Sequence, residues 1–278
     1  MTISQALSWA GGVLSDARVP NAAEDAEWLL ASLLGVGRLD LKVSGDKTLP
    51  DDDLEQFNAM IQRRKSREPL QYILGTQPFM GFEFAVSPDA LIPRFDTETL
   101  CEQAVLRLGE GAQVLDLCTG TGAIGISISL LCPDAQVTCT DISPKALLLA
   151  RKNAHALGAQ VRLLQGDLFD ALRGDEVFDM ILSNPPYIPT ADLPGLQQEV
   201  GYEPALALDG GGDGLDFYRR IIAQAPEFLK KGGLLGLEIG DGQAEAVTGL
   251  LQQDFRDIQL IRDLSGLDRV LFAALRKR

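Results

Sequence analysis

The chain has 278 residues, of which 46% are hydrophobic and 23% are charged, a balance typical of a globular protein with a large core. No apolar run approaches the roughly 20 residues that a membrane span needs, and the first residues lack the pattern of a secretory signal. We therefore expect a cytoplasmic protein without membrane contact. A net charge of −14 also disfavours stable binding to nucleic acid, because neutralising phosphates needs a basic surface.

Side chains that commonly bind zinc are few in this sequence. The four cysteines, Cys101, Cys118, Cys132 and Cys139, form no Cys-x-x-Cys pair, and His155 is the single histidine. A structural zinc site needs four such ligands at short spacings. We therefore expect buried free thiols and no metal.

The first 75 residues are predicted to form a small all-helical domain. Apolar residues recur at helical spacing in two segments, one before and one after the start signal Pro20-Asn21. A third segment, 51–65, begins with three aspartates and ends in basic residues, which suits both ends of a helix dipole. The basic residues between Arg63 and Arg67 would form either a solvated helix end or a patch that binds a partner.

Aromatic residues, glycines and a proline dominate residues 76–87, which predicts a hairpin-like connector. From residue 88 to 278, short apolar strands alternate with helical stretches. Such alternation predicts an α/β fold, with a doubly wound, Rossmann-like and mostly parallel sheet. Two consecutive strands near the end, 255–261 and 269–274, predict a C-terminal antiparallel hairpin.

A candidate cofactor loop lies between an apolar strand and an apolar helix. Its residues are Cys118, Thr119, Gly120, Thr121 and Gly122. The two glycines allow the backbone to approach a ligand closely, and ligands of open sheets bind beyond the carboxyl ends of the strands. A dinucleotide-binding fold would use a similar loop, so the loop alone does not select the cofactor.

Two carboxylates bear on the identity of the cofactor. Asp116 would repel a pyrophosphate but would suit the ammonium group of a methionyl moiety, directly or through water. Asp141, at the end of the next strand, is placed to accept both ribose hydroxyls, a device that NAD-binding proteins share. Leu168 and Phe169, after the third strand, would lie either against an adenine ring or in the core.

A candidate substrate loop follows the apolar strand 178–183. Its residues are Asn184, Pro185, Pro186 and Tyr187. Two prolines cannot continue a strand ladder, and their fixed dihedral angles make the turn rigid. The side-chain oxygen of Asn184 and the carbonyl of Pro185 would hold the two hydrogens of a planar NH2 group, while Tyr187 covers its flat face. This pattern predicts methyl transfer to an amide or amine nitrogen, with the proton lost afterwards.

With these motifs, the chain resembles the bacterial protein-(glutamine-N5) methyltransferases that modify peptide chain release factors. The resemblance covers nearly the whole sequence, although Asn-Pro-Pro-Tyr alone also occurs in DNA adenine methyltransferases. Two positions depart from the family pattern: Cys118 replaces a usual glycine and Phe95 a usual proline. The matching motifs are Arg67-Glu68-Pro69-Leu70-Gln71-Tyr72-Ile73-Leu74-Gly75, Phe82, Leu91-Ile92-Pro93-Arg94, Asp96-Thr97-Glu98, residues 116–122, Asn184-Pro185-Pro186-Tyr187-Ile188, Glu203-Pro204, Leu208-Asp209-Gly210-Gly211 and Asp213-Gly214-Leu215.

The resemblance implies a class I S-adenosylmethionine-dependent methyltransferase fold, and methylation of the glutamine in the Gly-Gly-Gln motif of release factors. S-adenosylmethionine would be the cofactor and S-adenosylhomocysteine the product. Residues 118–122 and Asp141 would bind the cofactor, with Leu168 near its adenine and Asn184 beside both cofactor and substrate. Residues 184–187 would hold the glutamine, and the helical domain 1–75 would recognise the protein substrate.

The residues themselves also allow three other functions. The same chemistry would serve adenine N6 of DNA, which needs base flipping and a basic channel, or a glutamine of a ribosomal protein. A regulatory module that binds a nucleotide without catalysis is the third, although it would need no rigid amide clamp. Two further motifs, Glu238-Ile239-Gly240 and 209–214, are interpreted as structural, the second as a helix cap.

Overall fold

The computed structural model describes residues 1–276, and these residues divide into two compact units. The helical unit comprises Met1–Thr76 together with the short segment Gln197–Tyr202. The sheet unit comprises Gln77–Leu196 and the chain from Glu203 onward. The segment 197–202 thus belongs with the helices, whereas the boundaries expected from the sequence placed it with residues 88–278.

The helical unit packs the apolar faces of its helices into one core. The largest buried side chains include Leu29, Phe57 and Ile61. The three helices expected from the sequence are present, and two more were missed because six and five residues are too few to show a helical period. Within the described residues the helices are α1 (Ile3–Asp16), α2 (Ala22–Leu34), α3 (Arg38–Val43), α4 (Asp51–Lys65) and α5 (Leu70–Leu74).

The basic cluster at the end of α4 is not uniformly solvated. Arg63 is exposed and pairs with Glu68, as a residue at a solvated helix end would. Arg64 is instead buried, and its Nε donates to Asp25 Oδ2 at 2.7 Å. A solvated helix end is therefore wrong for Arg64, because a guanidinium removed from water needs anionic partners.

The connector region and the main sheet account for the described strands. A two-stranded sheet is formed by β1 (Thr76–Phe79) and β2 (Phe82–Ala85). In the described chain the main sheet has seven strands in the order β5-β4-β3-β6-β7-β9-β8. They are β3 (Gln113–Leu117), β4 (Gln136–Asp141), β5 (Val161–Gln165), β6 (Phe178–Ser183), β7 (Leu229–Glu238), β8 (Phe255–Arg262) and β9 (Asp268–Leu275).

Strand directions confirm the predicted topology. The pairs formed among β3, β4, β5, β6 and β7 are parallel, whereas β9 pairs antiparallel with both β7 and β8. From β3 the chain proceeds to β4 and β5 on one side and returns to β6 and β7 on the other. This doubly wound order places a switch point beside β3, where open sheets bind their ligands.

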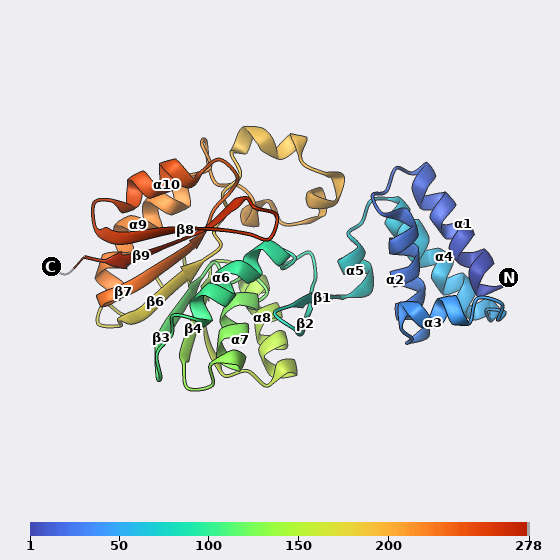
Figure 1. The fold of residues 1–278 in the computed structure, drawn as a ribbon, viewed down its shortest axis with the longest axis horizontal. Coiled ribbons are helices and arrows are strands. Elements are labelled where there is room, and N and C mark those ends of the chain that lie inside the picture. The colour runs from blue at the N-terminus through green and yellow to red at the C-terminus, as the bar shows by residue number, and fades with distance from the viewer. Residues whose placement is uncertain (277–278) are drawn as a thin grey trace. The chain divides into compact units, whose positions relative to one another are not determined.

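Helices cover both faces of the main sheet (Figure 1). Side chains that alternate along β3 enter opposite cores: Val114 joins the core under α6, α7 and α8, while Leu115 joins the core under α9 and α10. The helices are α6 (Phe95–Val105), α7 (Ala123–Leu131), α8 (Pro144–Leu157), α9 (Asp216–Phe228) and α10 (Ala244–Leu251).

Between β6 and α9 the chain is mostly irregular. It contains three short 3₁₀ helices in the described range, η1 (Thr190–Gly195), η2 (Gln198–Tyr202) and η3 (Ala205–Ala207). Of the helices among residues 1–276, none is long and apolar enough to cross a membrane.

Candidate active site

A cavity opens in the sheet unit where β3, β4 and β6 end. This is the position at which open parallel sheets bind ligands. Most of the residues predicted to contact cofactor or substrate line it, whereas Gly122, Pro185 and Tyr187 lie outside its lining. The predicted residues that line the cavity are Cys118, Thr119, Gly120, Thr121, Asp141, Leu168, Asn184 and Pro186.

The loop after β3 is a tight turn with three left-handed residues. Cys118, Gly120 and Gly122 have φ angles of 59°, 56° and 83°. A left-handed conformation costs a residue with a side chain roughly 1–2 kcal/mol. This cost is the physical reason why the family usually has glycine where this chain has Cys118. Gly122 precedes α7, and a Cβ there would lie 2.6 Å from Ile126 Cδ1, so its role is in packing the turn.

Asp116 braces this turn from below and does not line the cavity. Its Oδ2 accepts hydrogen bonds from the Thr119 hydroxyl and from the Gly125 amide at 3.0 Å. Burial raises the pKa of Asp116 to about 7, and the two hydrogen bonds oppose that rise. The expected direct contact between Asp116 and a ligand ammonium group is therefore not supported by its position.

Asp141 does face the cavity from the end of β4. Its Oδ2 accepts the Gly120 amide at 2.9 Å and its Oδ1 accepts the Ser143 amide at 2.8 Å. Burial raises the pKa of Asp141, while these two backbone hydrogen bonds lower it. The carboxylate is thus held in one orientation, and each oxygen keeps a lone pair for a ligand hydroxyl.

Two apolar side chains form part of the cavity wall near Asp141. Leu168 lines the cavity, whereas Phe169 is buried and stacks on Phe228 with ring centroids 4.8 Å apart. Ile142 also lines the cavity, and its exposed side chain is available to contact a ligand there. Sequence reasoning missed Ile142, which follows Asp141 directly and could have been found from that spacing.

Asn184 is held by a helix that precedes it in the chain by almost ninety residues. Its Nδ2 donates to Thr97 Oγ1 at 3.2 Å, and Thr97 is buried on α6. Thr97 engages one hydrogen of the Asn184 amide and so orients the group, and the amide oxygen is an acceptor available to a ligand at the cavity edge. From the sequence alone, Thr97 is part of the motif Asp96-Thr97-Glu98 and has no assigned role.

Glu238 lies beneath this pair at the end of β7. It is fully buried, and its Oε2 has no hydrogen-bond partner among the described residues. Burial raises the pKa of Glu238 to about 7, against the lowering effect of a hydrogen bond from Thr97 and of the Arg269 charge. Glu238 is therefore linked to Asn184 through Thr97, which goes beyond the structural role expected from the sequence.

Glycines make room for the backbone of the Pro186-Tyr187 turn. A Cβ on Gly210 would lie 2.7 Å from Tyr187 Cα, and one on Gly214 would lie 2.3 Å from the Tyr187 carbonyl oxygen. That carbonyl accepts a hydrogen bond from Gln243 Nε2 at 2.9 Å. The glycine-rich segment 209–214 therefore packs against the turn, in addition to its expected position before α9.

The cysteines stay free thiols in the described chain. Cys101 and Cys139 are buried, and burial raises their pKa well above the usual range. Within residues 1–276, no group of three or more His, Cys, Asp or Glu side chains is placed to hold a metal ion.

Comparisons with known proteins decide the family. The PrmC N-terminal domain family matches residues 5–75, and the methyltransferase small domain family matches residues 94–200. The release factor glutamine methyltransferase of Geobacter sulfurreducens is 49% identical over 272 residues, which cover 97% of this chain and 95% of the relative. That of Moorella thermoacetica is 44% identical over 283 residues, covering 100% of both chains. The chain belongs to the release factor glutamine methyltransferase family.

Solved structures agree with this family at the level of the fold. A methyltransferase of Pyrococcus furiosus superposes with a TM-score of 0.52 at 17% identity, covering 79% of this chain and 98% of that one. A 16S rRNA methyltransferase of T. thermophilus, in complex with AdoMet and guanosine, superposes with a TM-score of 0.52 at 22% identity, covering 72% and 50%. The predicted class I methyltransferase fold is thus confirmed. The relatives at 49% and 44% identity confirm the enzyme class.

In this chain, Gly210→Ala should disturb the Pro186-Tyr187 turn. The added methyl would meet backbone atoms, which cannot rotate away. Overpacking of this kind costs about 1–3 kcal/mol, and we expect a lower melting temperature together with a roughly tenfold or greater loss of methyl-transfer rate.

The matched control is Gly212→Ala, because a Cβ at Gly212 would meet no atom of the described residues within 4 Å. Thermal denaturation and single-turnover methyl transfer would be measured for both variants. Equal behaviour of the two variants would show that close packing at Gly210 does not position the turn.

Proposed function

We propose that this enzyme transfers a methyl group from S-adenosylmethionine to the side-chain nitrogen N5 of the glutamine in the Gly-Gly-Gln motif of release factors. The observation that carries the proposal is the amide of Asn184, held by Thr97 at the edge of a cavity that suits an adenosine cofactor. The names of the relatives from two bacteria support the choice of substrate.

The residues at the strand ends fit this cofactor. The turn 118–122 brings backbone to the cavity, and Asp141 offers an oriented carboxylate for the ribose hydroxyls. Leu168 and Ile142 offer an apolar surface for the flat adenine ring. When bound, S-adenosylmethionine would supply an electrophilic methyl group on its sulfonium.

The substrate amide would be held by the turn after β6. The side-chain oxygen of Asn184 and the carbonyl of Pro185 would each accept one hydrogen of the glutamine NH2 group. Two fixed acceptors favour the geometry in which the nitrogen lone pair, otherwise delocalised into the carbonyl, is directed out of the amide plane. The ring of Tyr187 would cover the amide face, and no side chain has to remove a proton before transfer.

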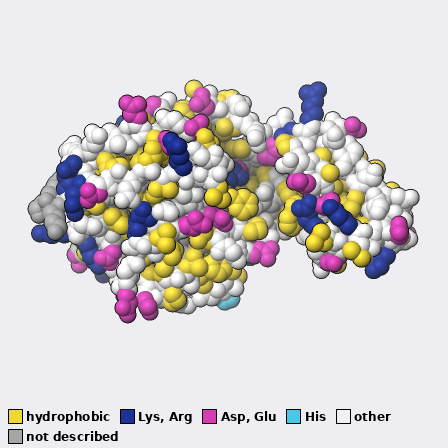
Figure 2. Space-filling view, in the orientation of Figure 1, with side chains coloured by type: hydrophobic (Ala, Val, Ile, Leu, Met, Phe, Trp, Pro, Cys, Tyr) yellow, Lys and Arg dark blue, Asp and Glu magenta, His cyan; other side chains and the backbone are white. Residues whose placement is uncertain are grey.

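The net charge of the chain favours a protein substrate over DNA, which is the substrate of the adenine methyltransferases that share Asn-Pro-Pro-Tyr. Adenine in a duplex must be flipped into a site served by a basic surface. The chain instead has a net charge of −14, and on the face drawn in Figure 2 its Lys and Arg side chains are scattered among Asp and Glu side chains. The turn itself does not separate release factors from ribosomal proteins, and the relatives' names favour release factors.

Two further assignments belong to this proposal. The helical residues 1–75 would recognise the protein substrate, and residues 88–278 would bind the cofactor and catalyse transfer. The reaction would take place in the cytoplasm, where reducing conditions keep the free thiols of this chain reduced.

The first test replaces Asn184. Asn184→Ala removes an acceptor from a partly desolvated site, and turnover should fall roughly a hundredfold, equivalent to about 2.7 kcal/mol of barrier. Asn184→Asp keeps an acceptor and should retain more activity than Ala. Cofactor affinity should change less than about tenfold in both variants, because the lost hydrogen bond belongs to the substrate.

Single-turnover methyl transfer to a purified release factor, beside calorimetric titration of the cofactor, measures both quantities. If Asn184→Ala transfers methyl at the wild-type rate, Asn184 only shapes the turn, and its proposed role as an acceptor for the substrate amide is wrong.

The second test replaces Thr97, which orients Asn184 without being expected to touch the substrate. Thr97→Val keeps the branched shape but removes the hydroxyl that accepts from Asn184 Nδ2. The freed amide can then rotate and present its NH2 group to the substrate NH2, where two donors face each other. We expect kcat to fall roughly tenfold with little change in cofactor affinity.

Thr97→Ser restores the hydroxyl and should recover most of that loss. If Ser is as impaired as Val, the methyl group of Thr97 matters more than its hydroxyl, and the proposed orientation of Asn184 loses its support.

A further inference from the structure

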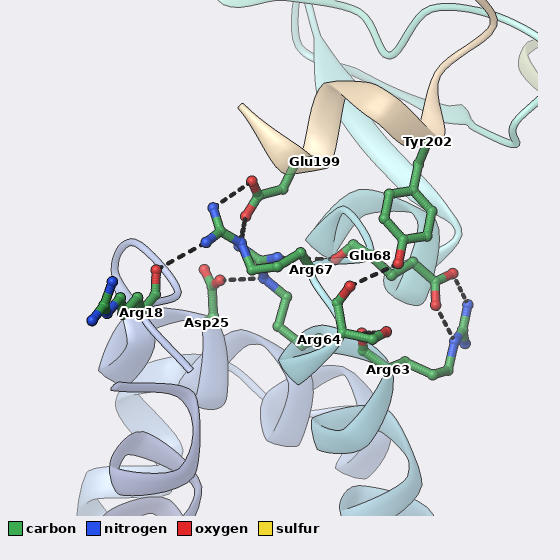
Figure 3. Close-up of polar contacts among 9 residues, drawn as sticks. Arg18, Asp25, Arg63, Arg64, Arg67, Glu68, Glu199 and Tyr202 are labelled. Carbon is green, nitrogen blue, oxygen red and sulfur yellow. Dashed lines mark hydrogen bonds and ion pairs between the residues drawn. The ribbon is translucent and has the colours of Figure 1, made fainter. Parts of the chain in front are cut away.

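A carboxylate far along the chain binds two arginines, one in the last turn of α4 and one just after it (Figure 3). Glu199 Oε1 accepts from Arg64 Nη2 at 2.9 Å and from Arg67 Nε at 2.7 Å. Its Oε2 accepts from Arg67 Nη2 at 2.6 Å. Arg67 thus engages both carboxylate oxygens, which is the geometry of the stronger and more directional ion pairs.

The network is shielded from water and balanced in charge. The side chains of Arg64, Arg67 and Glu199 are 5%, 17% and 15% exposed. Asp25 is the second anion, so two carboxylates face two guanidinium groups. Burial alone would raise the pKa of Glu199, but hydrogen bonds from Arg67 and Arg64 outweigh it and lower the pKa to about 2. Glu199 therefore stays ionised at any physiological pH.

Glu199 lies on η2 (Gln198–Tyr202), in which no residue is buried. Gln197, Gln198 and Gly201 are exposed. At the far end of the segment, the Tyr202 hydroxyl donates to the Ser66 carbonyl at 2.7 Å. Segments with few buried apolar contacts open locally at low cost, so polar anchors determine how firmly this one is held.

The same segment lies within the loop that follows the substrate turn. Twelve positions separate Glu199 from Tyr187, and three residues separate it from Glu203, which returns to the sheet unit. Glu203 is buried, accepts the Ile92 amide at 2.9 Å and pairs with Arg94. The next residues, among them Pro204 and Leu206, line the cavity. The loop therefore has polar contacts at Glu199, with Arg64 and Arg67, and again at Glu203, with Ile92 and Arg94.

We propose that Glu199 is a positioning residue: its ion pairs with Arg64 and Arg67 anchor the loop between the substrate turn and the cavity wall, and so prepare the loop for the protein substrate. The inference rests on the proposed function, because its effect is expected on a protein substrate. It also gives the basic cluster of α4 an internal partner in place of an external one.

The test uses Glu199→Gln in the full-length enzyme. The variant leaves Arg64 paired with Asp25, so the helical unit keeps its buried charge pair. Backbone amides of residues 190–208 should exchange hydrogen faster than in the wild type. For an intact release factor, kcat/KM should fall roughly tenfold, mainly through KM, while cofactor affinity stays within about twofold.

The matched control is Glu68→Gln, which removes the same charge from the same cluster but pairs with Arg63, outside the loop. Glu199→Asp keeps the charge and should recover part of the loss. Unchanged exchange of residues 190–208 in Glu199→Gln, or an equal loss of kcat/KM in Glu68→Gln, would overturn the anchoring role. If wild-type enzyme does not methylate the release factor, the proposed function fails, and hydrogen exchange still decides whether Glu199 anchors the loop.

Discussion

The proposed chemistry depends on a short stretch of rigid backbone. Pro185 and Pro186 fix the turn after β6, and Gly210 and Gly214 let neighbouring chain approach the next residue, Tyr187, more closely than a Cβ would allow. Thr97 then sets the direction of the Asn184 amide. A poor nucleophile such as an amide nitrogen gains from fixed acceptors, because the protein does not reorganise during transfer.

Carboxyl groups lie at the ends of three parallel strands around this turn: Asp116 in β3, Asp141 in β4 and Glu238 in β7. Burial raises the pKa of Asp116 and of Glu238 to about 7, so ionising either group is costly without a compensating charge. The hydrogen bonds from Thr119 and Gly125 favour the ionised form of Asp116. The hydrogen bond from Thr97 and the Arg269 charge favour that of Glu238.

Local patterns in the sequence predicted much of the fold and several of the residues that line the cavity. Alternating strands and helices indicated the doubly wound sheet, and residues 118–122, Asp141 and Asn184 lie at or just after the ends of strands, where ligands of such sheets bind. Contacts between distant residues left no local pattern. Arg64 and Glu199 are separated by 135 positions, and Thr97 meets Asn184 across 87. A glycine such as Gly210 shows in the sequence only as a flexible residue, because its close neighbour is defined by the fold.

The central proposal is that the rigid turn holds a glutamine amide during methyl transfer. The position of the transferred methyl group tests this proposal directly. Purified enzyme and a release factor would be incubated with isotopically labelled S-adenosylmethionine, and the modified peptide would be sequenced by tandem mass spectrometry. A release factor with alanine in place of the glutamine of its Gly-Gly-Gln motif serves as the control, beside ribosomal proteins and DNA. We expect one methyl group on the side-chain nitrogen of that glutamine and none on the release factor that has alanine in its place. Label on another residue, or label on DNA or ribosomal proteins but not on the release factor, would contradict it.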